Sequence, residues 1–317
     1  MTLIVDNRYT GQHGIARYSS EVLPRLGVPW LPIGLRRKPA AGFDALARVT
    51  APRRQRMYSP GYAAFVSGQR QLLTVHDLIH LETSGAQRAK YAAYYDLVVR
   101  PAIRRAGRVL TVSSTSAEAL RRWLRTDDID IINTGNACSA VFTQIGPEAE
   151  STEPYVVFVG NLREHKNVGV LVRALRMTSD VRLKMVIPAA EAERALALAL
   201  EFGIGERVDL HHGLSDEALA ELYRGAVATV LPSTLEGFGF PALESTCCGT
   251  PVLYWGECMA IAEATLGEGV PIEDAVDPRG WADGIAELAS SRRRTNPSSR
   301  PSWGDVADVV TDSVKGW

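Results

Sequence analysis

The chain has 317 residues, 46% hydrophobic and 22% charged, which suits about two packed domains and excludes wholesale disorder. The 35 Lys and Arg nearly balance the 36 Asp and Glu, so no nucleic-acid partner is predicted. The charge is uneven, because residues 1–150 carry +8 and residues 151–317 carry −9. This asymmetry favours two domains with different partners, and uneven surface solvation explains it equally well.

The N-terminal residues and the cysteines are those expected of a cytoplasmic protein. Asp6 follows only three apolar residues, so no export signal is predicted, and no run approaches the roughly 18 apolar residues of a membrane span. Cys138 and Cys258 stand apart from the adjacent pair Cys247 and Cys248, without the C-x-x-C spacing of a zinc site. The pair lies in an apolar helical stretch and is predicted to be buried. We expect a cytoplasmic protein.

Short apolar runs alternate with helical stretches along the whole chain. In the front half the expected strands are 3–6, 30–33, 72–76, 109–113 and 129–132, and the expected helices are 15–26, 86–105 and 116–125. In the back half the expected strands are 155–160, 182–187, 208–210, 228–231 and 251–254, and the expected helices are 168–176, 189–202, 216–223 and 241–248. Continuous apolar strands between helices indicate parallel sheets covered on both faces, and therefore an α/β protein with doubly wound domains.

A polar, proline-flanked stretch at 146–154 marks the expected domain boundary. We therefore expect one domain over residues 1–150 and a second over residues 151–300. Residues 301–317 form a C-terminal tail outside both expected domains. One arrangement of this tail has it cross back to the first domain.

The most informative segment runs from Leu231 to Glu244. A buried strand ends at Leu231, a glycine-containing loop follows, and Pro241 suits the first turn of a helix. Gly237 and Gly239 allow close approach of a ligand to the backbone, and the N–H groups at the helix start form an anion site. Alone, this segment is an ordinary strand, loop and helix with solvated acids.

The segment Glu236-Gly-Phe-Gly-Phe-Pro-Ala-Leu-Glu244, followed by Cys248-Gly-Thr-Pro-Val252, closely resembles the E-x7-E signature of family 4 retaining glycosyltransferases. Further segments match the same family in order; they are 11–18, 76–79, 111–114, 159–167 and 213–223. The resemblance covers about residues 1–290. It implies the GT-B fold, with two Rossmann-like domains facing a central cleft, an acceptor-side domain first and a nucleotide-sugar-binding domain second.

The resemblance also implies roles for individual residues. Lys166 matches the lysine that binds the donor diphosphate, and Arg163 matches a second cation in the same loop. Glu236 matches the acid beside the transferred sugar, and Glu244 matches the acid that binds the donor ribose. A solvated lysine or carboxylate is the alternative for each residue alone, but only five of the 35 basic residues are lysines, which makes a chance match at Lys166 less expected.

Three further matches concern the backbone and the first domain. The N–H groups of Phe238, Gly239 and Phe240 would meet the sugar and diphosphate. Gly14 matches a glycine close to the diphosphate, with a plain turn as the alternative. His76 matches a histidine near the donor sugar, although a histidine at a strand end is more often structural.

Metal chemistry is not expected. Asp128-Ile-Asp130 has the D-x-D spacing of a divalent-ion site in another glycosyltransferase fold, but it lies in an acidic stretch and is interpreted as solvated. The chain departs from the family at Asn133-Thr-Gly-Asn136, where a Pro-Asn-Gly turn is usual, and its front half is short. The geometry of the acceptor site is therefore the least constrained part.

The resemblance implies transfer of a sugar from a nucleotide diphosphate donor to a hydroxyl of a glycan or glycolipid, with retention and without a bound cofactor. Segments 14–18 and 165–167 look most like members that use GDP-mannose, so α-mannosyl transfer is favoured. The alternatives are a UDP-sugar-dependent member of the family, a GT-B nucleotide-sugar epimerase, and a silent binding protein. A cluster of basic residues in the front half suggests an anionic acceptor or a peripheral membrane contact, with a solvated face favoured about two to one; it comprises Arg36, Arg37, Lys38, Arg53, Arg54 and Arg56.

Overall fold

The computed structural model describes residues 2–11, 13–36, 38–40, 44–46, 55–66, 70–82, 86–297 and 299–317. The chain divides into two compact units, residues 1–137 with 301–317, and residues 138–300. The polar stretch 146–154 belongs to the second unit because helix α8 (Asp216–Gly225) binds the beginning of this stretch. The Arg224 guanidinium of α8 donates to the carbonyls of Pro147 and Thr143 at 2.7 and 3.1 Å, and Ala149 N–H donates to Glu221 O.

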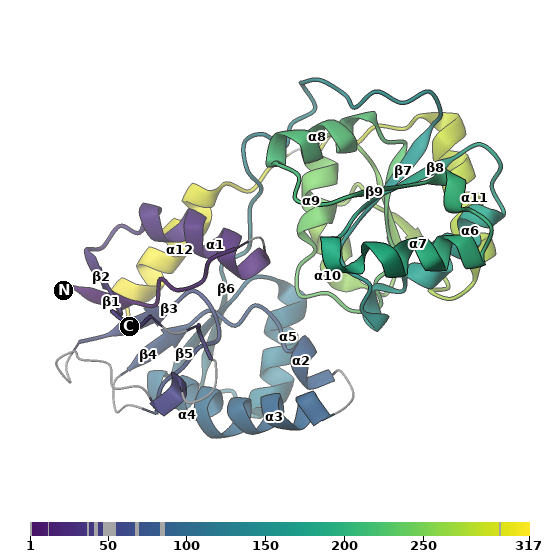
Figure 1. Cartoon of the computed structure of the whole chain (residues 1–317). Coiled ribbons are helices and arrows are strands. Elements are labelled where there is room, and N and C mark those ends of the chain that lie inside the picture. The colour runs from purple at the N-terminus through teal and green to yellow at the C-terminus, as the bar shows by residue number, and fades with distance from the viewer. Residues whose placement is uncertain are drawn as a thin grey trace. The chain divides into compact units, whose positions relative to one another are not determined.

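The first unit is an α/β structure with very short strands (Figure 1). Its strands are β1 (Leu3–Val5), β2 (Trp30–Pro32), β3 (Met57–Ser59), β4 (Gln71–Leu73), β5 (Arg108–Thr111) and β6 (Asp130–Asn133). Its helices are α1 (Gly14–Val22), α2 (Ile79–Glu82), α3 (Ala86–Tyr94), α4 (Arg100–Ala106), α5 (Ser114–Leu124) and α12 (Trp303–Lys315), with a π-helical turn at Tyr95–Val99 between α3 and α4.

The strands of the first unit are parallel, in the order β2-β1-β3-β4. An isolated parallel bridge from Thr74 to Leu110 continues this sheet into the pair β5-β6. The chain adds β2 on one side of β1 and β3 on the other, so the strand order reverses beside β1. Ligands of doubly wound sheets bind at the carboxyl ends of the strands at such a point.

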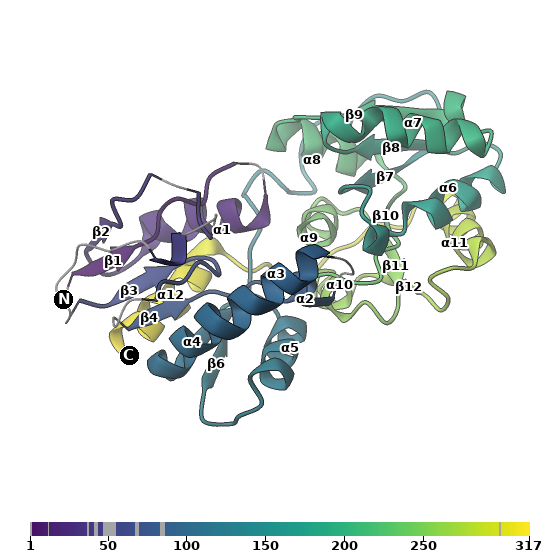
Figure 2. The ribbon, with the colours of Figure 1, turned by 60° about the horizontal axis from the view of Figure 1, so that its bottom comes forward.

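The second unit carries the longer sheet (Figure 2). Its strands are β7 (Tyr155–Val159), β8 (Arg182–Val186), β9 (Val208–His211), β10 (Ala228–Leu231), β11 (Val252–Trp255) and β12 (Val270–Ile272). Its helices are α6 (Val168–Arg176), α7 (Ala192–Glu201), α8 (Asp216–Gly225), α9 (Phe240–Cys247), α10 (Met259–Ala264) and α11 (Pro278–Ser291).

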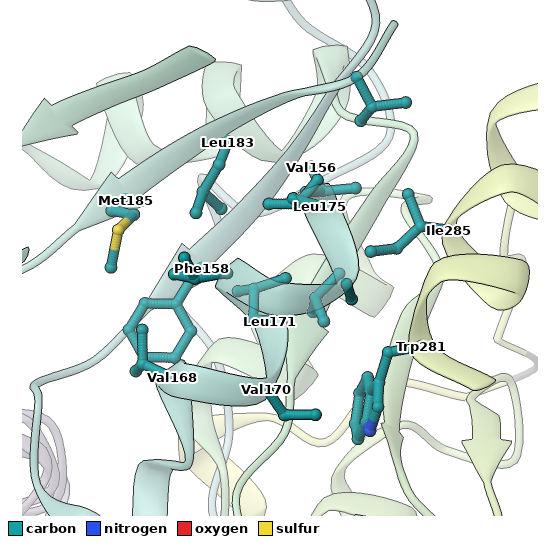
Figure 3. Close-up of a cluster of buried hydrophobic side chains, with 14 of the residues drawn as sticks. Val156, Phe158, Val168, Val170, Leu171, Leu175, Leu183, Met185, Trp281 and Ile285 are labelled. Carbon is teal, nitrogen blue, oxygen red and sulfur yellow. The ribbon is translucent and has the colours of Figure 1, made fainter. Parts of the chain in front are cut away.

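The six strands of the second unit are all parallel, in the order β12-β11-β10-β7-β8-β9. Helices α6, α7 and α11 cover one face and α8, α9 and α10 cover the other. Figure 3 shows the first core, where Val156 and Phe158 of β7 lie with Leu171 of α6 and with Trp281 and Ile285 of α11. Both faces are therefore buried, as the continuous apolar strands predicted.

Several elements escaped the sequence prediction. Strand β3 has only three residues and follows an arginine-rich segment, and β12 contains a proline. Helices α11 and α12 carry recognisable start signals, because the Asp277 side chain accepts from Arg279 N–H and Ser302 forms a capping box with Asp305.

All four cysteines are free and buried, which confirms the prediction for Cys247 and Cys248. Among the helices of the described residues, none is long and apolar enough to cross a membrane.

Candidate functional site

The candidate site of the second unit lies where its strand order reverses. The chain proceeds from β7 to β8 and β9 on one side and returns to β10 on the other, so β7 and β10 are neighbours. Their carboxyl ends lead into two loops, 160–167 and 232–239. In doubly wound sheets, ligands usually bind at the carboxyl ends of the strands where the strand order reverses.

The loop after β7 is shaped to present Lys166. A single 3-10 turn, Glu164–Lys166, ends at Asn167 in the left-handed conformation, with φ +50°. Asparagine tolerates this conformation better than most residues. Its side chain donates to Ala275 O at 2.7 Å, which anchors the turn to the loop before α11. The lack of a side chain at Gly160 leaves room for the Phe158 ring, since a Cβ there would lie 3.1 Å from Phe158 Cζ.

The loop after β10 is tied to the first loop by its backbone. Thr234 N–H donates to His165 O at 2.8 Å. Farther along, Gly239 has φ +99°, a conformation that disfavours any side chain, and a Cβ there would meet Ile261 of α10 at ordinary contact distance. Helix α9 begins at the next residue, with Pro241 in its first turn as predicted. Helix α10 thus lies next to this loop at Gly239.

Lys166 and Glu236 meet between the two loops. The Lys166 Nζ donates to Glu236 Oε1 at 2.5 Å, and the two side chains are only 14% and 13% exposed. The resemblance implied separate roles for these residues; the structure brings them into one ion pair that joins the ends of β7 and β10. Because both groups are largely removed from water, the pair is stronger than an exposed salt bridge.

The surroundings of the pair carry donors for an anion. The N–H groups of Phe238 and Gly239 donate no hydrogen bond to any part of the chain that the structure describes. They precede α9, whose N-terminus carries a partial positive charge. The exposed Arg163 guanidinium likewise has no partner among the described residues, and its backbone N–H is held by Asn161 Oδ1 at 3.2 Å. The Phe238 and Phe240 rings pack edge to face, 5.4 Å apart.

The second acid of the signature lies in a different environment. Glu244 is 4% exposed within α9, and the Tyr223 hydroxyl of α8 donates to its Oε2 at 3.3 Å.

Burial, and next the charge of Lys166, lower the pKa of His165 below its usual value, so that this imidazole stays neutral.

The two first-domain residues lie in the first unit. Gly14 is the first residue of α1, and the N-cap His13 accepts from Ala16 N–H through Nδ1 at 3.2 Å. His76 follows β4 and is 7% exposed, with Nε2 2.9 Å from Pro60 O. Burial is the main cause that lowers the His76 pKa to about 4. The ring is therefore neutral near pH 7, with its proton on Nε2.

The basic cluster of the first unit is only partly described. Arg37, Arg53 and Arg54 lie outside the described residues. Arg56 is half-buried, with its guanidinium over the Trp317 ring at 5.8 Å. Within the described ranges, no group of three or more His, Cys, Asp or Glu side chains is arranged to hold a metal ion.

The profile of the family "Glycosyl transferases group 1" matches residues 143–302, half of the chain, and this range includes Lys166, Glu236 and Glu244. The chain belongs to this family. The resemblance to family 4 glycosyltransferases is thus confirmed. Relatives of this group 1 glycosyltransferase include the D-inositol 3-phosphate glycosyltransferase of Mycobacteroides abscessus, 32% identical over 59% of this chain and 44% of the relative. The O-antigen chain mannosyltransferase RfbU of Salmonella typhimurium is 24% identical over 69% of this chain and 60% of RfbU.

Solved structures of low sequence identity share the fold along almost the whole chain. Sucrose-phosphate synthase of Thermosynechococcus elongatus gives a TM-score of 0.68 at 18% identity, covering 99% of this chain and 94% of that one. Anabaena HepE, solved with UDP and glucose, gives 0.69 at 14% identity, covering 100% and 99%. The predicted GT-B fold is confirmed. The chain spans about half the length of the D-inositol 3-phosphate glycosyltransferase of Mycobacteroides abscessus.

Sequence reasoning singled out Lys166, Glu236 and Glu244 but did not predict which residues they contact. The ion pair itself, the Thr234 to His165 link and the Tyr223 partner of Glu244 join segments about 70, 69 and 21 residues apart. The strand order that makes β7 and β10 neighbours was the missing information. Asn167, directly after Lys166, carried a readable signal for the left-handed turn.

Proposed function

We propose that this group 1 glycosyltransferase moves a sugar from a nucleotide diphosphate donor to a hydroxyl of a glycan or glycolipid acceptor, with retention of the anomeric configuration. The observation that carries the proposal is the Lys166–Glu236 pair at the carboxyl ends of β7 and β10. The Phe238 and Gly239 N–H groups follow Glu236 in the same loop, and helix α9 begins at the next residue.

Lys166 stabilises the leaving group in this proposal. Cleavage of the glycosidic bond leaves negative charge on the diphosphate, and donors fixed in place before the reaction stabilise that charge at little reorganisation cost. The Lys166 ammonium has three N–H bonds, of which Glu236 accepts one. The remaining two face the diphosphate, with the Phe238 and Gly239 N–H groups and the Arg163 guanidinium as further donors.

Glu236 acts through position rather than through covalent attack. A carboxylate that already accepts a short hydrogen bond from an ammonium is a weak nucleophile. Retention then requires another route, and we assign the acceptor proton to the departing phosphate oxygen on the same face of the sugar. Glu236 holds Lys166 in place and accepts from a hydroxyl of the transferred sugar.

His76 contributes a neutral imidazole. Its Nε2–H is committed to Pro60 O, so Nδ1 is the nitrogen left to accept a hydrogen bond. A sugar hydroxyl is the chemically matching donor. With a pKa of about 4, this imidazole does not supply a proton at neutral pH.

No divalent metal takes part in the proposed reaction. Lys166, Arg163 and the N–H groups near α9 supply the positive charge that a metal ion provides in other transferases. Turnover that survives EDTA supports this assignment, and turnover restored only by Mg²⁺ or Mn²⁺ contradicts it.

GDP-mannose is the proposed donor, and an α-mannoside is the proposed product. The likeness to a mannosyltransferase, RfbU, supports this choice. A UDP-sugar is the second candidate, favoured by the fold relatives solved with UDP. At equal concentration GDP is expected to raise the melting temperature more than UDP, since stabilisation grows with affinity. A larger shift with UDP overturns the donor assignment and leaves the transferase proposal intact.

A donor panel tests the transferase activity itself. GDP-mannose, UDP-glucose and UDP-GlcNAc are incubated with and without candidate glycan or glycolipid acceptors, and free nucleotide and products are quantified. Nucleotide release that rises with acceptor supports transfer. Conversion of donor into an isomeric nucleotide sugar without acceptor identifies an epimerase, and binding without turnover identifies a silent binding protein.

A peripheral membrane contact of the basic residues around Arg36 and Lys38 is a separate proposal, supported by the excess positive charge of residues 1–150. The protein should co-sediment with anionic liposomes at low salt and release at high salt. Absence of binding at low salt contradicts this contact.

A further inference from the structure

The imidazole of His76 is held on several sides within the first unit. Its Nε2–H donates to Pro60 O at 2.9 Å, and its backbone carbonyl accepts from the Ser116 hydroxyl at 2.7 Å. The Tyr18 ring of α1 meets the imidazole edge to face, with ring centroids 4.9 Å apart and planes at 84°. The His76–Pro60 hydrogen bond fixes one edge of the imidazole, and the Tyr18 ring therefore covers another side of it.

Tyr18 is itself fixed by a directed hydrogen bond. Its side chain is fully buried, and its hydroxyl lies 3.1 Å from Thr134 Oγ1. The single Thr134 hydroxyl proton has carbonyl acceptors in Thr111 at 3.0 Å and Gly135 at 3.2 Å. Since carbonyls cannot donate, Thr134 gives its proton to one of them and accepts from Tyr18.

A third ring extends this row of contacts. The indole of Trp303, the first residue of α12, meets the Tyr18 ring with centroids 6.1 Å apart and planes at 76°. Helix α12 packs beside α1 in the first unit (Figure 1). The rings of His76, Tyr18 and Trp303 thus come from three segments far apart in the sequence.

The partners of Tyr18 stand next to the two places where the chain passes between the units. The chain leaves the first unit after Ala137, three residues beyond Thr134, and re-enters it at Pro301, two residues before Trp303. Tyr18 accordingly touches the last part of the outgoing segment through its hydroxyl and the first part of the returning segment through its ring.

We infer that Tyr18 is a positioning residue, which orients the His76 imidazole and couples it to both chain segments that connect the units. The inference rests on the proposed function in so far as His76 contacts the donor sugar. The His76 side chain is the reacting-site group; Tyr18 acts only through it.

The ionisation of His76 reports on this arrangement. Removing the Tyr18 ring admits water to the imidazole, and water favours the charged form of a buried histidine. The other titratable group that acts on His76 is the N-cap His13 of α1, which disfavours a charge there by like-charge repulsion. His13 and Pro60 remain in all variants below, so a change in titration reports on Tyr18.

The test combines an NMR titration of the His76 Cε1–H signal with steady-state kinetics on the full chain. We expect Tyr18→Leu to raise the titration midpoint from about 4 by about one unit, a fraction of the shift that full burial imposes. Trp303→Leu, which acts through Tyr18, should shift it less and in the same direction. Tyr18→Phe keeps the ring and should keep the midpoint, but loss of the Thr134 bond should lower kcat more than it changes the donor KM.

Tyr155→Phe in the second unit is the matched control, because it removes a buried hydroxyl that donates to Leu222 O. It should change neither the midpoint of the His76 titration, nor kcat, nor the donor KM. A His76 midpoint that stays near 4 in folded Tyr18→Leu and Trp303→Leu overturns the inference, as does a kcat effect of Tyr18→Phe no larger than that of the control.

Trp303→Phe decides the matter if the leucine variants do not fold. It should still shift the His76 midpoint upward, and an unchanged midpoint overturns the inference. Failure of the proposed function is distinguishable, because it shows as absent donor turnover in the wild-type protein. The titration needs neither donor nor acceptor and still decides whether Tyr18 positions His76.

Discussion

The two units share a doubly wound sheet but prepare their candidate residues in different ways. In the second unit, charged side chains from two loops meet in an ion pair at the point where the strand order reverses. In the first unit, His76 is buried, neutral and surrounded by aromatic and hydroxyl groups. One unit is therefore equipped to hold an anion, and the other to accept a hydrogen bond from a neutral group. The proposed function assigns the charged diphosphate to the second unit and a neutral hydroxyl of the sugar to His76.

Lys166→Met should produce the largest effect, because it removes the cation from the proposed leaving-group site. We expect donor turnover to fall about 10²- to 10³-fold, the usual cost of losing one fixed transition-state donor. Steady-state kinetics with the donor found in the panel measures it. Lys90→Met, at an exposed site on α3, is the control and should keep wild-type turnover. Near-normal kinetics of Lys166→Met would reduce this lysine to a loop residue.

The two acids of the second unit should separate into different functions. Glu236→Gln should lower kcat with little change in nucleoside diphosphate affinity. Glu244→Gln should weaken that affinity about tenfold, which corresponds to ~1.4 kcal/mol and to one charge-assisted hydrogen bond. Calorimetry gives the affinities. Tyr223→Phe is the matched control for Glu244, since it removes the internal hydrogen bond and keeps the carboxylate. Equal losses of affinity in both acid variants would contradict the assigned roles.

His76 makes the stability of the first unit depend on pH in a predictable direction. Its pKa is about 4 in the folded protein, against 6.5 when exposed. Between these values the unfolded chain binds one proton more, so stability falls as the pH drops from 6.5 to about 4 and changes no further below. The loss amounts to roughly 3 kcal/mol, from 1.36 kcal/mol per pKa unit.

Urea unfolding at several pH values checks this prediction. The free energy of unfolding of the wild-type protein should depend on pH between pH 6.5 and pH 4. His76→Gln should reduce the slope of that dependence by the contribution of one proton. The histidines at positions 165 and 211, whose pKa values are also lowered by burial, keep their part of the slope in both proteins. An unchanged slope in His76→Gln would show that His76 titrates as an exposed group.

How far the sequence predicts this molecule depends on how local the signal is. Helix α6 was predicted to the residue, since its apolar positions repeat with the helical period. Strand β3 was missed because three residues beside an arginine-rich segment carry no recognisable pattern. Glu236 and Glu244 were singled out through their resemblance to the E-x7-E signature, which lies within one loop and helix.

Long-range connections were beyond such reasoning. The contact of Lys166 with Glu236 depends on β7 and β10 being neighbours, and that order is a property of the sheet. The environment of His76 likewise depends on Tyr18 of α1 and on the Pro60 carbonyl, which come from separate segments. Burial of Glu244 against Tyr223 joins two helices of one face. Each case needs the packing of the folded chain.

Calorimetric titration of a nucleoside diphosphate into the wild-type protein and the Lys166→Met variant tests the central claim most directly. Arg176→Met, which removes an exposed positive charge from α6 in the same unit, is the control. If the end of β7 and the end of β10 form the diphosphate site, Lys166→Met should weaken the binding of GDP or UDP about tenfold or more, and Arg176→Met should leave it unchanged. Equal affinity of the wild-type protein and Lys166→Met would contradict the account.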